Sequence, residues 1–134
     1  MSEVSADRPT VLVVDDEEDL RDIMRRMLER RGFATMVAGD SEHAIATCRD
    51  HPGEIDVLVT DLGLPGASGG ELARAATAVR PRMGVVYISG LPKDIAVTKG
   101  LITDDALLVK KPFTSELLIE ALRQVIAQRA TYTQ

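Results

Sequence analysis

The stretch that decides the fold of this chain is Val11-Leu12-Val13-Val14-Asp15-Asp16. A short, continuous apolar run of this kind is typical of a parallel strand that is buried on both faces. Two later stretches have the same design: Val57-Leu58-Val59-Thr60 ends on Asp61, and Leu107-Leu108-Val109 ends on Lys110-Lys111-Pro112. Because ligands of open α/β sheets bind beyond the carboxyl ends of the strands, these endings indicate a charged site at one edge of a sheet.

Strands and helices are expected to alternate along the rest of the chain. Apolar runs predict strands over residues 10–15, 33–38, 56–60, 85–89 and 106–110. Helical spacing of apolar residues and capping residues predict helices over about 20–31, 41–51, 71–80, 93–99 and 115–128. Five strands alternating with five helices predict an α/β fold with a parallel sheet covered on both faces.

Size and composition are those of one soluble domain. The chain has 134 residues, of which 45% are hydrophobic and 28% charged. The net charge of −5 is unfavourable for direct nucleic-acid binding. No apolar run approaches the roughly 20 residues of a membrane span, and residues 1–9 lack a signal sequence, so we expect a cytoplasmic protein without membrane insertion. The single cysteine, Cys48, excludes an internal disulfide and is expected to be a packed thiol.

Crowded carboxylates at a strand end favour a cation site. Asp15 and Asp16 begin an acidic run that continues to Asp19. Acids in the first turn of a helix interact favourably with its dipole, which is the structural alternative. Mg²⁺ commonly binds one or two carboxylates together with waters and phosphate oxygens. Asp61 alone could be a turn residue, but beside a bound cation its carboxylate could act as a nucleophile and form an aspartyl phosphate.

Two further side chains at strand ends could complete such a site. Ser89 closes the fourth predicted strand, and its hydroxyl could donate to a phosphoryl oxygen. Strand alternation sends Lys110 and Lys111 to opposite sides, so Lys111 is expected to face the acids. The glycine-rich loop 63–70 lacks the ending of a nucleotide-binding P-loop. It is expected to be a rim loop that could offer the Gly63 carbonyl to the cation.

The remaining charged side chains are expected to be solvated. Five arginines make the first helix basic, which predicts an exposed face, with a partner-docking face as the alternative; they are Arg21, Arg25, Arg26, Arg30 and Arg31. His43 and His51 have no companion ligand at metal-binding spacing and are expected on the surface.

Residues 10–128 resemble a receiver domain of two-component response regulators. The resemblance rests on Asp15-Asp16, Asp61, Leu64-Pro65-Gly66 with Gly69 or Gly70, Ser89 and Lys111-Pro112-Phe113, in that order. It implies a single-domain, doubly wound (βα)5, flavodoxin-like three-layer sandwich with strand order 2-1-3-4-5. Residues 1–9 would then be a flexible lead-in and 129–134 a C-terminal tail. The stretches 62–66 and 86–91 are most similar to receivers of hybrid histidine kinases.

The resemblance also implies roles. Asp61 would accept a phosphoryl group from a histidine kinase or a histidine phosphotransfer protein. Mg²⁺ would be bound by Asp16, Asp61 and the Gly63 carbonyl, with Asp15 acting mainly through a water. Ser89 would be the switch hydroxyl, and Lys111 would pair with the phosphoryl group, with a cis peptide bond before Pro112.

One residue departs from the family pattern. Leu108 stands where many receivers have an aromatic residue that moves on phosphorylation. Gly63 and Leu91 cannot orient water with their side chains, so slow self-dephosphorylation is expected. The expected function is therefore a phosphorylation-dependent switch, with dimerisation as an option, rather than an enzyme. An unphosphorylated interaction module and an aspartyl-nucleophile phosphohydrolase remain as alternatives. No DNA-binding output domain is expected within the chain, and whether it stands alone is open.

Overall fold

Five parallel strands form the centre of the molecule. The computed structural model describes residues 8–64, 66 and 68–132. Within this part, the strands pair in the order β2-β1-β3-β4-β5, all of them parallel. They are β1 (Thr10–Val14), β2 (Ala34–Ala38), β3 (Val57–Asp61), β4 (Gly84–Ser89) and β5 (Leu107–Lys110). The order confirms the 2-1-3-4-5 topology that the resemblance implies.

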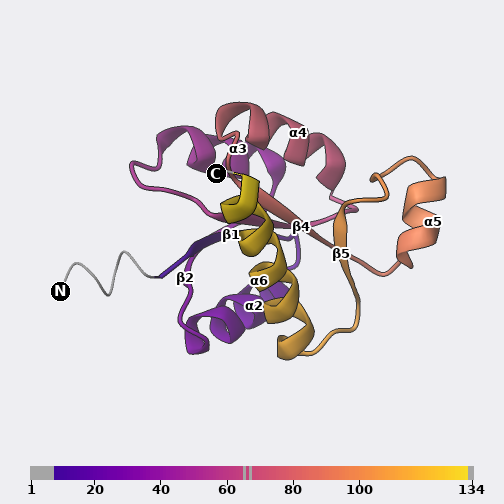
Figure 1. Cartoon of the computed structure of the whole chain (residues 1–134), viewed down its shortest axis with the longest axis horizontal. Helices are drawn as coiled ribbons and strands as arrows, with labels where there is room; N and C mark the ends of the chain where they lie inside the picture. Colours follow the sequence, from indigo (N-terminus) through magenta and orange to yellow (C-terminus); the bar gives the residue numbers. More distant parts are fainter. Residues whose placement is uncertain (1–7, 65, 67, 133–134) are drawn as a thin grey trace.

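Helices cover both faces of this sheet. They are α2 (Glu18–Arg30), α3 (Ser41–Asp50), α4 (Gly69–Val79), α5 (Lys93–Thr98) and α6 (Ser115–Tyr132). Helices α2 and α6 lie on one face and α3 and α4 on the other, while the short α5 stands beyond the β5 edge (Figure 1). The three layers confirm the predicted flavodoxin-like α/β sandwich.

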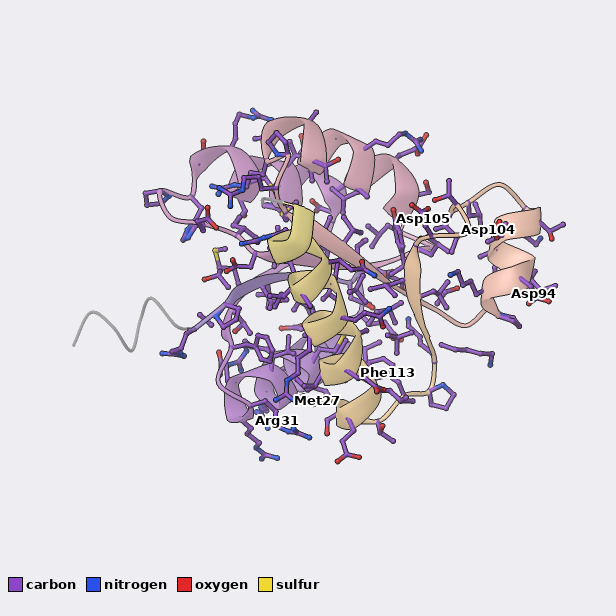
Figure 2. The ribbon with its side chains drawn as sticks, viewed as in Figure 1. Met27, Arg31, Asp94, Asp104, Asp105 and Phe113 are labelled. Carbon is purple, nitrogen blue, oxygen red and sulfur yellow. The ribbon has the colours of Figure 1, made fainter. Side chains whose placement is uncertain are left out.

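The alternation of side chains along the strands divides the core in two. Val11 and Val13 pack with residues of α2 and α6, where Met27 and Phe113 close the cluster (Figure 2). Leu12 and Val14 pack on the other face with residues of α3 and α4, including the buried Cys48, as predicted for that thiol. Every side chain of β1 from Val11 onward is fully buried, which explains its unbroken apolar run.

A third, smaller cluster holds α5. It consists of Leu62, Ala96 and Ile102, with neighbours that include Tyr87 and Leu108. Tyr87 of β4 lies opposite Leu108 of β5 in the sheet register. Helix α5 is therefore attached through fewer buried side chains than the other helices.

Several boundaries differ from the sequence-based prediction. Helix α4 begins at Gly69 rather than at Glu71, because Ser68 and Glu71 form a capping box that satisfies amide groups of the first turn. Helix α6 continues to Tyr132, through most of the segment 129–134 expected to be a tail.

The ends of the chain and one loop are described only in part. Residues 1–7 of the expected lead-in, 133–134 of the expected tail, and 65 and 67 of the rim loop lie outside the described residues. At the start of the described part, the Pro9 carbonyl accepts a hydrogen bond from Ala34 N at 2.9 Å, so the chain joins the sheet before β1 begins. Among the described helices, none combines the length and the hydropathy that crossing a membrane requires.

Candidate functional site

Three carboxylates meet at the carboxyl ends of β1 and β3. In the register of this pair Val14 lies opposite Thr60, so Asp15 and Asp61 follow side by side. One oxygen from each of Asp15, Asp16 and Asp61 lies within 4.8 Å of the others. Such a set of oxygen ligands has the chemistry that a hard divalent cation prefers.

Asp15 is the most buried of the three acids. Its side chain is 0% exposed, and Oδ1 accepts a hydrogen bond from Glu17 N at 2.8 Å. Oδ2 has no hydrogen-bond partner among the described residues. Burial raises the pKa of Asp15, the nearby charges of Asp61 and Asp16 raise it further, and the Glu17 bond and Lys111 oppose the rise without cancelling it. A buried carboxylate oxygen that accepts no hydrogen bond from the described residues fits a bound cation.

Asp61 is held from two sides but stays accessible. Oδ1 accepts a hydrogen bond from Gly63 N at 2.9 Å, and Oδ2 accepts one from Lys111 Nζ at 3.0 Å. The Asp61 side chain is 14% exposed, so a reactant can reach it from the edge of the sheet. The two hydrogen bonds fix the orientation of this carboxylate.

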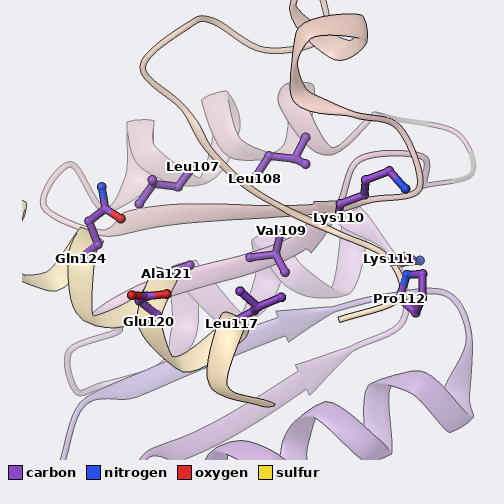
Figure 3. A pocket seen from close by; sticks show the side chains of 10 residues that line it. All are labelled: Leu107, Leu108, Val109, Lys110, Lys111, Pro112, Leu117, Glu120, Ala121 and Gln124. Carbon is purple, nitrogen blue, oxygen red and sulfur yellow. The ribbon is translucent and has the colours of Figure 1, made fainter. Parts of the chain in front are cut away.

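Lys111 follows β5 and approaches two of the acids. Its Nζ lies 3.0 Å from Asp61 Oδ2 and 3.7 Å from Asp15 Oδ2. Burial disfavours the charged ammonium, but the hydrogen bond to Asp61 and the charges of Asp61 and Asp15 outweigh it, so the pKa of Lys111 is raised. The Lys111–Pro112 peptide bond is cis, as expected. Lys110, the last residue of β5, is exposed (Figure 3).

Ser89 lies at the neighbouring end of β4. It is buried, its carbonyl accepts a hydrogen bond from Lys111 N at 2.7 Å, and its Oγ accepts one from Leu91 N at 3.0 Å. The hydroxyl thus holds the start of the loop that leads to α5 through its hydrogen bond with Leu91 N. The structure brings Asp15, Asp16, Asp61 and Lys111 together and places Ser89 beside them with its hydroxyl turned to the loop.

Arg21 is a residue that the sequence reasoning missed. The basic helix was expected to present a solvated face, and Arg25 and Arg26 do pair with Asp22 on the surface of α2. For Arg21 this expectation is wrong, because its Nη1 donates to the Asp15 carbonyl at 2.9 Å. The signal that could have found it is Gly39, the residue after β2 that leaves room for the guanidinium.

Comparisons with known proteins identify the family. A family model described as "Response regulator receiver domain" matches residues 11–123. The sensory transduction protein RegX3 of Mycolicibacterium smegmatis is 32% identical over 121 residues, covering 90% of this chain and 52% of that protein. The sensor kinase CckA of Brucella abortus is 27% identical over 121 residues, covering 90% and 13%, in keeping with the expected likeness to receivers of kinases.

Solved structures agree with the family match. The crystal structure of a response regulator receiver protein from Sinorhizobium medicae WSM419 has 31% sequence identity and a TM-score of 0.80, covering 92% of this chain and 98% of that one. The chain spans about half or less of the length of the curated relatives it matches. With the fold and the acidic strand ends described above, these matches show that the chain belongs to the response regulator receiver domain family.

Proposed function

We propose that Asp61 accepts a phosphoryl group from a histidine kinase or a histidine phosphotransfer protein, and that Mg²⁺ is required. The observation that supports this most directly is the accessible Asp61 carboxylate, fixed by Gly63 N and Lys111 Nζ beside the acids of β1. An Asp61 oxygen forms the new bond to phosphorus, while the bond between phosphorus and the donor imidazole nitrogen breaks and its electron pair returns to the ring.

The residues around Asp61 would have two roles, to bind the cation and to orient the reacting groups. Asp16 and Asp61, with Asp15 behind them, would hold the cation, and the Gly63 carbonyl is the fourth proposed ligand group. Bound Mg²⁺ would neutralise negative charge on the incoming phosphoryl group. Lys111 would keep Asp61 oriented and offer its ammonium to a phosphoryl oxygen, since it already lies at hydrogen-bond distance from the acceptor.

Phosphorylation would be transmitted through Ser89. Turning the Ser89 hydroxyl toward a phosphoryl oxygen requires it to release Leu91 N, which now fastens the β4–α5 loop. Because α5 is held by a small cluster, a modest change at this loop can shift its position. With Leu108 at the expected aromatic position, this path does not depend on a moving ring.

The surface that would respond includes a groove of about 370 Å³ between β5 and α6 (Figure 3). Its lining includes Leu108 and Leu117, and the Leu117 residue is 51% exposed. We propose that phosphorylation changes the binding of a protein target here, with dimerisation as one form of that response. Consistent with the sequence, we place this activity in the cytoplasm, without direct nucleic-acid binding.

The proposal is tested by phosphorylating the chain chemically. Incubation with acetyl phosphate and Mg²⁺ is expected to add one phosphoryl group, detected by intact-protein mass spectrometry. Asp61→Asn is expected to take up none, and chelation of Mg²⁺ is expected to stop the reaction. A phosphoryl group that still appears on the Asp61→Asn protein would contradict the assignment.

The two alternatives give different outcomes in the same preparation. An unphosphorylated interaction module is expected to bind no Mg²⁺ in a titration and to stay unmodified. A phosphohydrolase is expected to turn over a phosphate ester through many cycles. Gly63 stands two residues after Asp61, where a phosphohydrolase would need an acid to protonate the leaving group, so we expect no such turnover.

A further inference from the structure

We infer that Arg21 is a positioning residue for the proposed metal site. It would act by holding the peptide unit between Asp15 and Asp16 in the orientation that directs both carboxylates toward Asp61. The inference rests on the proposed Mg²⁺ site and adds to it a residue from α2 that forms no ion pair with a carboxylate of the described residues.

The contact itself is specific. Arg21 Nη1 donates to the Asp15 carbonyl oxygen at 2.9 Å. This carbonyl belongs to the peptide group that joins Asp15 to Asp16, so the bond fixes the plane from which both side chains depart. The other backbone bond of Asp15, from its N to the Ala38 carbonyl, is long at 3.3 Å. The sheet therefore holds the Asp15 backbone only weakly, and the hydrogen bond from Arg21 restrains it further.

Gly39, which directly follows β2, leaves the space that the Arg21 guanidinium occupies. A Cβ at Gly39 would lie 2.9 Å from Arg21 Nη1 and 3.6 Å from Arg21 Cζ, and it would meet no other atom of the described residues within 4 Å. The φ angle of Gly39 is not positive. The missing side chain at this position thus makes room for the guanidinium rather than relieving backbone strain.

The neighbouring arginines do not share this role. Arg25 pairs with Asp22 and Glu29, and Arg26 pairs with Asp22 while its side chain is 66% exposed. Among the described residues, the side-chain cation within ion-pair distance of the site carboxylates is Lys111, which contacts both Asp15 and Asp61. Arg21 instead contacts a neutral backbone group, so its contribution is geometric.

The test measures Mg²⁺ affinity by isothermal titration calorimetry for Arg21→Ala, Gly39→Ala and the double variant. Arg21→Ala and Gly39→Ala are each expected to weaken Mg²⁺ binding about 10-fold, the lower end of the range for partners that orient metal ligands. Gly39→Ala keeps the charge of Arg21 and displaces only its tip. The double variant is expected to bind no more weakly than Arg21→Ala, because the added methyl group then meets no side chain. Arg26→Ala is the matched control, with unchanged affinity.

A second readout separates positioning from folding. The Mg²⁺ concentration that gives half-maximal phosphorylation by acetyl phosphate is expected to rise in Arg21→Ala and Gly39→Ala, while the rate at saturating Mg²⁺ stays near that of the wild type. Without Mg²⁺, Gly39→Ala is expected to lower the free energy of unfolding less than Arg21→Ala does, since only the end of a flexible side chain has to move. This variant also tests the inference if Arg21→Ala fails to fold.

Two results would overturn the inference while leaving the proposed function intact. If Arg21→Ala binds Mg²⁺ more tightly than the wild type, Arg21 acts through its charge, because removing a cation near the site removes a repulsion. If both variants bind like the wild type, Arg21 has no part in the site. A wild-type protein that binds no Mg²⁺ would remove the metal site itself, and with it both proposals.

Discussion

The ammonium of Lys111 lies between two carboxylates, 3.0 Å from Asp61 Oδ2 and 3.7 Å from Asp15 Oδ2. One side chain from the end of β5 thus offsets part of the negative charge of acids from β1 and β3. A divalent cation bound by the same acids would be repelled by this lysine, while an incoming phosphoryl group would be attracted by it. The two processes should therefore respond in opposite directions when the charge is removed.

Lys111→Gln is expected to strengthen Mg²⁺ binding and to slow phosphorylation. Affinity rises because a like charge is removed from the cation site. The rate of modification by acetyl phosphate falls, by about 10²-fold, because a fixed donor to the phosphoryl group is lost. Calorimetry and timed mass spectrometry measure the two effects. Lys110→Gln, at the exposed neighbouring position, should change neither, and a matching loss of Mg²⁺ affinity in Lys111→Gln would refute this description of the site.

Asp15 predicts a pH dependence of stability. Burial raises the pKa of Asp15 in the folded state, so the folded protein holds this proton more tightly than the unfolded chain does. The free energy of unfolding contributed by this group therefore falls as pH rises from the unfolded pKa through the folded pKa, and stays low above it. Asp15→Asn is expected to be more stable than the wild type above this window, by about 1–3 kcal/mol, because the neutral amide removes a buried charge and its repulsion by Asp61 and Asp16.

The quantity to measure is the difference in free energy of unfolding between the wild type and Asp15→Asn. Other acids, whose pKa values are lowered, change the stability of both proteins in the opposite direction with pH, and the difference removes their effect. They include Asp22, Asp40 and Asp105. Urea unfolding in chelator over a pH series measures this difference. It should grow with pH across the window and shrink when Mg²⁺ is added to the wild type. A constant difference at all pH values would show that the Asp15 carboxylate is not destabilising.

The strand ends could be predicted because burial and sequence coincide there. Val11 to Val14 are buried on both faces, so their apolar run marks the strand and fixes where Asp15 begins. The closeness of Asp61 to Asp15 required the strand order, which came from the family resemblance rather than from periodicity. Whether these residues bind Mg²⁺ and accept a phosphoryl group remains a prediction.

Contacts between long side chains and distant backbone groups could not be predicted. Arg21 looks like its neighbours on a basic helix, and only the folded structure shows that a carbonyl lies within its reach. The start of α4 was misplaced because Gly69 and Gly70 read as loop, whereas the Ser68–Glu71 capping box makes them the first helical residues.

Helix α4 approaches the backbone of Asp61 and Leu62 so closely at Gly69 that a side chain does not fit there. A Cβ at Gly69 would collide with the Asp61 carbonyl oxygen and lie 2.9 Å from Leu62 Cα. Both are backbone atoms that cannot move aside cheaply, so Gly69→Ala is expected to lower the free energy of unfolding by about 1–3 kcal/mol and to slow phosphorylation. At Gly63, the new methyl group would meet only Asp61 Oδ1, at 3.9 Å. Gly63→Ala is thus the control in thermal unfolding, and equal effects of the two changes would contradict the close approach of α4 to β3.

Replacing Arg80 is expected to lower the stability of the fold without affecting phosphorylation. Its guanidinium donates to the carbonyls of Cys48, His51 and Gly53, at and just beyond the end of α3. Carbonyls at a helix end have no partner within the helix, so a cation that binds them both satisfies them and interacts favourably with the helix dipole. Arg80→Ala is expected to cost about 2 kcal/mol in urea unfolding, since bonds to a charged donor are lost.

The site should be unaffected by this change, because α3 runs antiparallel to the strands and ends at the edge of the sheet opposite Asp61. The extent of phosphorylation by acetyl phosphate is therefore expected to equal that of the wild type at a temperature where both are folded. Arg82→Ala, two residues further on and exposed, is the matched control and should keep wild-type stability. If Arg80→Ala unfolds like the wild type, the three hydrogen bonds contribute nothing net, and α3 must be held by its packing on the sheet alone.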